Sequence, residues 1–167
     1  MTKGPHNGPF FISSMLIKKL EELFFQENQH LVEVLDKTHG TWVSSMVKQR
    51  GYGIVLVELK ELNGLKFGIP LRSNIKHKAC FKTKEGESKG LDYSKAVLLT
   101  KESYIASEPF MIPSEEYVKV KDREHHITQM FTKYVEKYRS GVRKNDQNVL
   151  RGYQFSTLQN YHAELGI

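Results

Sequence analysis

With 167 residues the chain is long enough for one domain with its own core. Its formal net charge of +6 favours an acidic partner but does not identify one. The single cysteine, Cys80, excludes an internal disulfide framework, is expected to be buried rather than nucleophilic, and is typical of a reducing cytoplasm. No apolar run approaches the ~20 residues that span a bilayer and the N-terminus lacks the apolar region of a secretory signal, so we expect a flexible tail over residues 1–9 and one cytoplasmic domain over residues 10–167, with no membrane partner.

The N-terminal half predicts a helix and then a hairpin. Apolar residues recur at helical spacing between Met15 and Gln26. The segment from Tyr52 to Leu59 is rich in β-branched and aromatic residues, and Asn63-Gly64 supplies two residues that tolerate positive φ, which predicts a tight hairpin turn. The returning strand is expected from Leu65 to Ile69, and Pro70 should end it because proline has no N–H to donate.

The middle of the chain predicts further strands. Lys78 to Thr83 and Tyr93 to Thr100 have the composition of a second hairpin, joined by a polar loop. The segment from Tyr104 to Pro113 is expected to be irregular. Tyr117 to Lys121 alternates apolar and basic residues, which predicts an edge strand whose lysines discourage unwanted pairing.

From Asp122 onward the apolar period changes to about 3.6 residues, which predicts a helix that packs on the sheet and ends at Gly141. Its apolar stripe comprises Ile127, Met130, Phe131, Tyr134, Val135 and Tyr138. Ser156 to Gln159 has the spacing of a capping box, and Gly166 is the expected terminator of the last helical segment. Strands in the middle and helices at both ends predict an α+β fold with a twisted, mainly antiparallel sheet.

Several kinds of site are excluded by their missing motifs. No HExxH, CxxC or DxD pattern occurs, and the adjacent His125 and His126 would point about 100° apart on a helix, so we expect no metal. The run Arg50-Gly51-Tyr52-Gly53 precedes a strand rather than opening a helix, which argues against a phosphate-binding loop. No Gly-x-Ser-x-Gly elbow is present. We expect no cofactor.

The segment from Arg72 to Lys78 holds a hydroxyl, an imidazole and three cations directly after a predicted strand. RNA can be cleaved without a metal when its own 2′-hydroxyl attacks the neighbouring phosphate. Such a reaction needs proton transfer, for which an imidazole with a pKa near 6.5 is suited, and cations that stabilise the charge on phosphorus. These groups are supplied by Ser73, Lys76 and His77, by Arg50 or Lys48 from the neighbouring strand, and by Arg72 and Lys78 at flanking phosphates.

Each of these residues also has a purely structural interpretation. Lys76-His77-Lys78 can be a solvated strand start, Ser73 can be a turn residue, and the basic residues of the long helix can be a solvated face. Trp42 and Tyr52 can stack on bases or pack in the core. The predicted catalytic residues are Ser73, Lys76, His77 and Arg50, and the predicted RNA-binding residues are Lys48, Tyr52, Arg72, Lys78, Lys82, Arg139 and Arg143.

A longer pattern resembles a known family. The glycine-flanked strand followed by Pro70-Leu71-Arg72-Ser73 and Lys76 resembles the ToxN/AbiQ superfamily of bacterial type III toxins. With Phe67-Gly68-Ile69 and the run Gly90-Leu91-Asp92-Tyr93-Ser94-Lys95-Ala96-Val97 added, the chain is most similar to the TenpN branch. The resemblance is concentrated between residues 48 and 105.

This resemblance implies a metal-independent, sequence-selective endoribonuclease whose sheet is similar to that of the MazF/Kid toxins. It implies cleavage of mRNA and of the toxin's own antitoxin RNA precursor, with 2′,3′-cyclic phosphate and 5′-hydroxyl ends. It also implies inhibition by a pseudoknot antitoxin RNA in a closed toxin–RNA assembly, and growth arrest that can abort phage infection in the bacterial cytoplasm.

The resemblance assigns roles to individual residues. Ser73 corresponds to the serine that the family places at the scissile phosphate, and Lys76 to the lysine that stabilises the phosphorane. In the ToxN branch that lysine comes one residue earlier, so Lys76 and Lys78 are alternatives. A lysine ahead of the family's first strand corresponds to Lys48 or Arg50.

Two other classes of function compete with the nuclease. A non-catalytic RNA-binding protein on the same scaffold would use the basic surface to occupy RNA, and it should be harmless when expressed without its RNA. A protein-interaction surface that poisons an enzyme such as a gyrase would arrest growth with bulk mRNA intact and DNA supercoiling altered.

Overall fold

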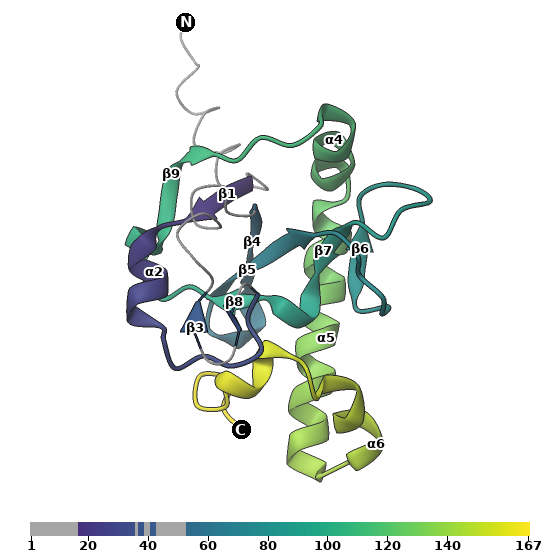
Figure 1. The fold of residues 1–167 in the computed structure, drawn as a ribbon. Coiled ribbons are helices and arrows are strands. Elements are labelled where there is room, and N and C mark those ends of the chain that lie inside the picture. The colour runs from purple at the N-terminus through teal and green to yellow at the C-terminus, as the bar shows by residue number, and fades with distance from the viewer. Residues whose placement is uncertain (1–16, 36, 39–40, 43–52) are drawn as a thin grey trace, which may run out of the picture.

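The computed structural model describes residues 17–35, 37–38, 41–42 and 53–167 (Figure 1). The predicted tail over residues 1–9 lies outside these ranges. None of the helices within them is long and apolar enough to cross a membrane.

An open, mainly antiparallel sheet of seven of the described strands is the centre of the fold. Its strand order is β6-β7-β5-β4-β1-β9, and β8 pairs with β5 beside this path. A separate pair is formed by β2 and β3. The strands are β1 Ile17–Leu20, β2 Lys37–Thr38, β3 Thr41–Trp42, β4 Ile54–Leu59, β5 Leu65–Arg72, β6 Cys80–Lys82, β7 Gly90–Asp92, β8 Val97–Leu98 and β9 Ile105–Pro109.

Among the described residues, one α-helix follows β1, the others follow β9, and the longest of them packs on the sheet, which confirms the predicted α+β class. The α-helices are α2 Glu22–Glu27, α4 Ser114–Asp122, α5 Glu124–Lys144 and α6 Gln147–Leu150. Short 3₁₀ helices lie at Lys60–Leu62, Tyr93–Lys95, Glu102–Tyr104, Arg151–Tyr153 and Thr157–Asn160. In Figure 1 the long α5 runs behind the sheet, and α6 lies at its C-terminal end.

The β4–β5 hairpin forms as predicted, with Ile54 opposite Pro70 at one end and Leu59 opposite Leu65 at the other. Asn63 and Gly64 have φ values of 57° and 70°, so both adopt the left-handed conformation expected from their sequence.

Pro70 does not end β5, which continues to Arg72. The N–H of Leu71 bonds the carbonyl of Gly53, on the β4 side of the strand. Because successive residues of a strand point their N–H groups to opposite sides, the Pro70 nitrogen faces the other side. On that side β8 pairs only with Phe67 and Gly68, and β7 only with Leu71 and Arg72. The missing N–H of Pro70 therefore removes no bond from the ladder.

The predicted apolar stripe of α5 forms the contact between helix and sheet, except for Met130, which is exposed. Ile127, Phe131 and Val135 are completely buried. The Phe131 ring lies edge-on to Phe67 of β5, with 5.3 Å between ring centroids, and 5.8 Å from the ring of Tyr93. This packing holds β5 and the segment after β7 against one helix, which positions the ends of both strands.

Gly141 does not terminate α5, since the helix runs to Lys144 and ends at Asn145 in the left-handed conformation, φ 51°. A Cβ atom at Gly141 would lie 2.8 Å from Val149 Cγ1. The glycine therefore serves the close packing of α5 against α6. Ser156 does cap its segment by accepting from the Leu158 N–H, but the segment is a 3₁₀ helix.

The prediction of a helix from Met15 to Gln26 is wrong over Ile17–Leu20, which form β1, and α2 begins only at Glu22. Ile17 and Leu20 are both buried, a spacing that fits a helix equally well. Pairing with β4 and β9 decides the outcome, with Ile17 opposite Val55 and Leu20 opposite Ile105. Tertiary pairing overrides a short local pattern here.

Two further predictions are wrong. The expected irregular segment contains β9, which is a strand because it pairs with β1. The expected edge strand from Tyr117 to Lys121 belongs to α4, where Glu116 and Val120 are buried four residues apart on one helix face.

The second hairpin exists with a different partner. β6 pairs with Gly90–Asp92 instead of with Tyr93–Thr100, and β8 from that stretch pairs with β5. As a result β7 lies between β6 and β5, and Gly90 is opposite both Lys82 and Arg72.

Buried and half-buried tyrosines make the fold sensitive to alkali. Burial raises the pKa of Tyr153 to about 12, and burial also raises the pKa values of Tyr93, Tyr134 and Tyr161. An unfolded tyrosine titrates near pH 10, so between about pH 10 and 12 the folded state keeps protons that the unfolded state has lost. The free energy of unfolding should therefore fall as the pH rises through this window.

We expect Tyr153→Phe to flatten that decline by up to about 1.4 kcal/mol per pH unit, which is the linkage for one proton. Urea unfolding at a series of pH values between 9 and 12 measures the slope directly. An unchanged slope in the variant would show that Tyr153 does not contribute to the alkaline transition.

Candidate functional site

The buried carboxylate of Asp92, at the end of β7, gathers three polar side chains from separate segments. Its Oδ2 atom lies 2.9 Å from Arg72 Nη1, at the end of β5. Its Oδ1 atom lies 3.2 Å from His77 Nε2 and accepts from the Ser94 hydroxyl at 2.6 Å. Asp92 is fully buried, whereas the side chains of Arg72 and His77 are 31% and 41% exposed. The buried carboxylate thus contacts the inner sides of two half-exposed basic groups, the Arg72 guanidinium and the His77 imidazole. We refer to these four residues as the Asp92 cluster.

Hydrogen bonds define which nitrogen of His77 carries the proton. The backbone N–H of Ala79 donates to Nδ1 at 3.1 Å, so Nδ1 has the lone pair. Nε2 then carries the hydrogen and faces both the carboxylate of Asp92 and the Ser94 hydroxyl, which is 3.4 Å away. The ring is therefore oriented with Nε2–H inward and Nδ1 as its basic nitrogen.

The segment that carries Ser94 is fixed from several sides. The Asp92 side chain caps the 3₁₀ helix Tyr93–Lys95 by accepting from the Ser94 N–H at 3.0 Å. The buried Thr157 hydroxyl bonds the carbonyls of Ser94 and Ala96. These contacts tie the Asp92 cluster to the C-terminal part of the chain.

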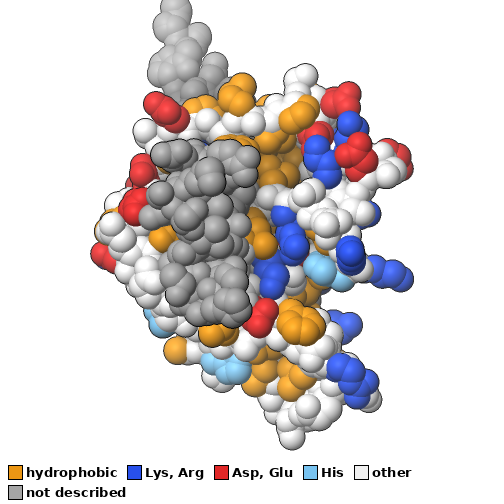
Figure 2. Space-filling view, viewed as in Figure 1, with side chains coloured by type: hydrophobic (Ala, Val, Ile, Leu, Met, Phe, Trp, Pro, Cys, Tyr) orange, Lys and Arg blue, Asp and Glu red, His pale blue; other side chains and the backbone are white. Residues whose placement is uncertain are grey.

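The predicted catalytic and phosphate-binding residues after β5 lie on the surface. Ser73, Lys76, Lys78 and Lys82 are exposed. Their side chains make no hydrogen bond or ion pair within the part of the chain that the structure describes. Asn74 adopts φ 62°, and Ile75 is buried, which turns the chain after Ser73 and anchors it. Figure 2 shows lysine and arginine side chains gathered over β5, β6 and β7, with a histidine among them.

The other predicted residues do not join this surface. Arg139 is mostly buried and bonds the Leu165 carbonyl and the Glu136 carboxylate at 2.8 Å each, so it holds the C-terminus. Arg143 is exposed in the last turn of α5, beside α6 and away from β7 (Figure 1). The predictions for Lys48, Arg50 and Tyr52 lie outside the described residues.

Cys80 is half-buried beside the cluster, and its thiol lies 3.5 Å from the carbonyl oxygen of His77. Burial raises the pKa of this thiol, an effect that the charge of Asp92 reinforces and that of Lys82 opposes. A thiol that stays protonated is a poor nucleophile, which supports the prediction that Cys80 is not a nucleophile, but the side chain is half-buried where full burial was expected.

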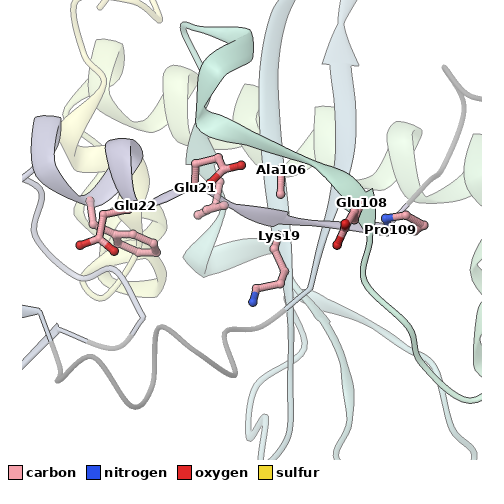
Figure 3. A pocket seen from close by; sticks show the side chains of 8 residues that line it. Lys19, Glu21, Glu22, Ala106, Glu108 and Pro109 are labelled. Atoms are coloured by element: carbon pink, nitrogen blue, oxygen red, sulfur yellow. The ribbon is translucent and has the colours of Figure 1, made fainter.

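A separate hollow of about 290 Å³ lies between β1, β9 and α2 (Figure 3). It shares no lining residue with the Asp92 cluster, and its walls mix acidic, basic and apolar side chains. The lining residues are Lys19, Leu20, Glu21, Glu22, Phe25, Ala106, Glu108 and Pro109. Among the described residues, no group of three histidine, cysteine or acidic side chains is placed to hold a metal ion.

Sequence reasoning missed Asp92 and Ser94 as members of the site. The available signal was their spacing, because an aspartate two residues before a serine often accepts from the later backbone N–H in a turn. Comparisons of the chain with protein-family models, curated proteins and solved structures found no match. Membership of the ToxN/AbiQ superfamily and likeness to the MazF/Kid sheet therefore stay predictions.

Proposed function

We propose that this protein is a metal-independent endoribonuclease, the toxin of a type III toxin–antitoxin system of the TenpN kind. The observation that carries the proposal is the oriented His77: a buried carboxylate holds its Nε2–H, and its basic Nδ1 lies in the same segment as exposed Ser73 and Lys76. A carboxylate that fixes one imidazole nitrogen while the other transfers protons is a recurring catalytic arrangement.

In the proposed reaction the 2′-hydroxyl oxygen attacks the adjacent phosphorus and its proton passes to His77 Nδ1. Lys76, or Lys78, and the Ser73 hydroxyl contact the phosphate oxygens, where negative charge increases. Arg72 keeps guanidinium N–H groups beyond the one that bonds Asp92, and these can contact a flanking phosphate. The bond to the 5′-oxygen breaks and this oxygen takes a proton from solvent water, while His77 later returns its proton to solvent. The products are a 2′,3′-cyclic phosphate and a 5′-hydroxyl.

In the cell, the proposed substrates are mRNA and the precursor of an antitoxin RNA, and the proposed inhibitor is that RNA folded as a pseudoknot in a closed assembly. The excess of cations beside β5, β6 and β7 supports an RNA partner, because phosphate contacts supply most of the affinity of such complexes.

A second candidate, a non-catalytic RNA-binding protein, is favoured by the bond from the Ala79 N–H to His77 Nδ1 at 3.1 Å. That bond occupies the nitrogen that would have to accept the proton. The nuclease requires the 2′-hydroxyl to replace the Ala79 N–H, whereas a binding protein requires no change of partner.

The test is incubation of purified protein with mixed mRNA in EDTA, followed by sequencing of the fragments that carry 5′-hydroxyl ends. We expect discrete ends at a preferred sequence, and a loss of about 10²–10⁴-fold in cleavage rate for His77→Ala, the usual contribution of a proton-transfer group. Ser73→Ala and Lys76→Ala should also slow cleavage, because each removes a contact to the phosphate.

Glu85→Ala, in the exposed loop between β6 and β7, is the matched control and should cleave at the normal rate. If well-folded wild-type protein leaves the RNA intact but binds it, the binding protein is the correct class. If Ser73→Ala and His77→Ala both cleave normally, the site is elsewhere.

A further inference from the structure

Phe155 is an exposed aromatic residue in a segment whose other large apolar side chains are buried. Its side chain is 63% exposed, and it is the only aromatic ring among the exposed large apolar residues that the structure describes. Two residues earlier Tyr153 is buried against Tyr134 and Tyr138, and Ser156 and Leu158 are also buried. The Phe155 ring is therefore left outside the core that takes up the neighbouring Tyr153 and Leu158.

The backbone on both sides of Phe155 is held in place. The ammonium group of Lys95 donates to the Phe155 carbonyl at 2.9 Å. Gln159 Nε2 donates to the carbonyls of Gln154 and Ser156. The Phe155 ring thus projects into solvent from a fixed backbone, which lowers the entropy that a ligand must remove on binding.

These same contacts tie the Phe155 backbone to the segment that carries Ser94. Lys95, whose ammonium group bonds the Phe155 carbonyl, directly follows Ser94 in the chain. The hydroxyl of Thr157, two residues after Phe155, donates to the Ser94 carbonyl. Figure 2 shows hydrophobic side chains immediately beside the lysine and arginine side chains on this face.

We propose that Phe155 is a stacking platform for an unpaired nucleobase of single-stranded RNA, whose neighbouring phosphates contact the exposed cations. An exposed ring beside clustered positive charge is the combination that single-stranded nucleic acid requires, since bases stack on rings while phosphates pair with cations. This inference rests on the proposed function and adds to it the class of RNA and the residue that contacts the base.

The experiment measures binding of a 2′-O-methylated decanucleotide, which the proposed reaction cannot cleave, by fluorescence anisotropy at several salt concentrations. A second oligomer has the same backbone with abasic sites. We expect Phe155→Ala to raise the Kd of the base-containing oligomer by about 5- to 150-fold, the range found for removal of one stacking ring. The Kd of the abasic oligomer and the salt dependence should stay unchanged, because the phosphate contacts remain.

Phe155→Trp should bind the base-containing oligomer as the wild type does, because its ring still stacks. Met111→Ala, which truncates an exposed apolar side chain on another segment, is the matched control and should bind both oligomers normally. Wild-type affinity in Phe155→Ala, or an equal loss for both oligomers, overturns the inference.

The outcome is separable from that of the proposed function. RNA cleavage together with Phe155-independent binding overturns the inference alone. Phe155-dependent binding without cleavage supports the inference and moves the protein to the non-catalytic class. No binding of either oligomer by the wild-type protein overturns both.

Discussion

Replacement of Asp92 by alanine is expected to destabilise the protein by about 2–4 kcal/mol, because three partners lose their shared buried acceptor. The Ser94 hydroxyl and backbone N–H both bond Oδ1, so the cap of the 3₁₀ helix is lost with the charge. Arg72 and His77 are partly exposed and can turn to water, which keeps the cost below that of a fully enclosed ion pair. Urea denaturation monitored by circular dichroism measures the change.

Asp92→Asn separates the two contributions of this residue. The amide oxygen can still accept from Ser94, so the loss of stability should be smaller than for alanine, while His77 and Arg72 lose the negative charge that orients them. Glu85→Ala removes a carboxylate from the exposed loop and should change stability by less than about 0.5 kcal/mol. Equal stability of wild type and Asp92→Ala would show that the cluster does not hold these segments together.

Gly90→Ala is expected to destabilise the protein by about 3 kcal/mol or more. A Cβ atom at this position would lie 2.1 Å from the Phe81 carbonyl oxygen and 3.0 Å from Lys82 Cα, both in the backbone of β6. A backbone atom in a paired strand cannot move aside as a side-chain tip can, so the added methyl group must separate β6 from β7. The thermal unfolding midpoint and the urea midpoint should both fall.

Gly152→Ala provides the control for the glycine substitution, because a Cβ atom there meets no atom within 4 Å. It lies in the 3₁₀ helix Arg151–Tyr153, where alanine reduces the freedom of the unfolded chain, so stability should be unchanged or rise by up to about 1 kcal/mol. If Gly90→Ala were as stable as Gly152→Ala, the close approach of β6 and β7 would be wrong.

The elements that the sequence predicted correctly are those with an apolar period over several turns or with a turn defined by adjacent residues. The α5 stripe covers several turns, and the Asn63-Gly64 turn needs only two residues with positive φ. β1 and β9 were missed because each is a strand through pairing with distant segments: β1 pairs with β4 and β9, and β9 pairs with β1 across more than 80 positions of the chain. No local pattern contains that information.

The candidate site was predicted in part for a related reason. Ser73, Lys76 and His77 directly follow β5, a strand that the pattern located, so their proximity was predictable. Asp92 joins them only because β7 pairs with β5, which places it within 2.9 Å of Arg72. Sequence analysis assigned the returning strand to the residues after Asp92, so the buried carboxylate at the centre of the cluster was missed.

The contacts of Lys95 have a consequence for protein synthesis. Its ammonium group bonds the Glu33 carbonyl, near the start of the described chain, and the Phe155 carbonyl, near its end. The hydroxyl of Thr157, two residues after Phe155, donates to the Ser94 carbonyl. Residues 155–157 leave the ribosome about 60 positions after Ser94, so a nascent chain lacks this support until they have emerged. A chain truncated before residue 155 would therefore lack both the contacts that support Ser94 and the aromatic ring of Phe155.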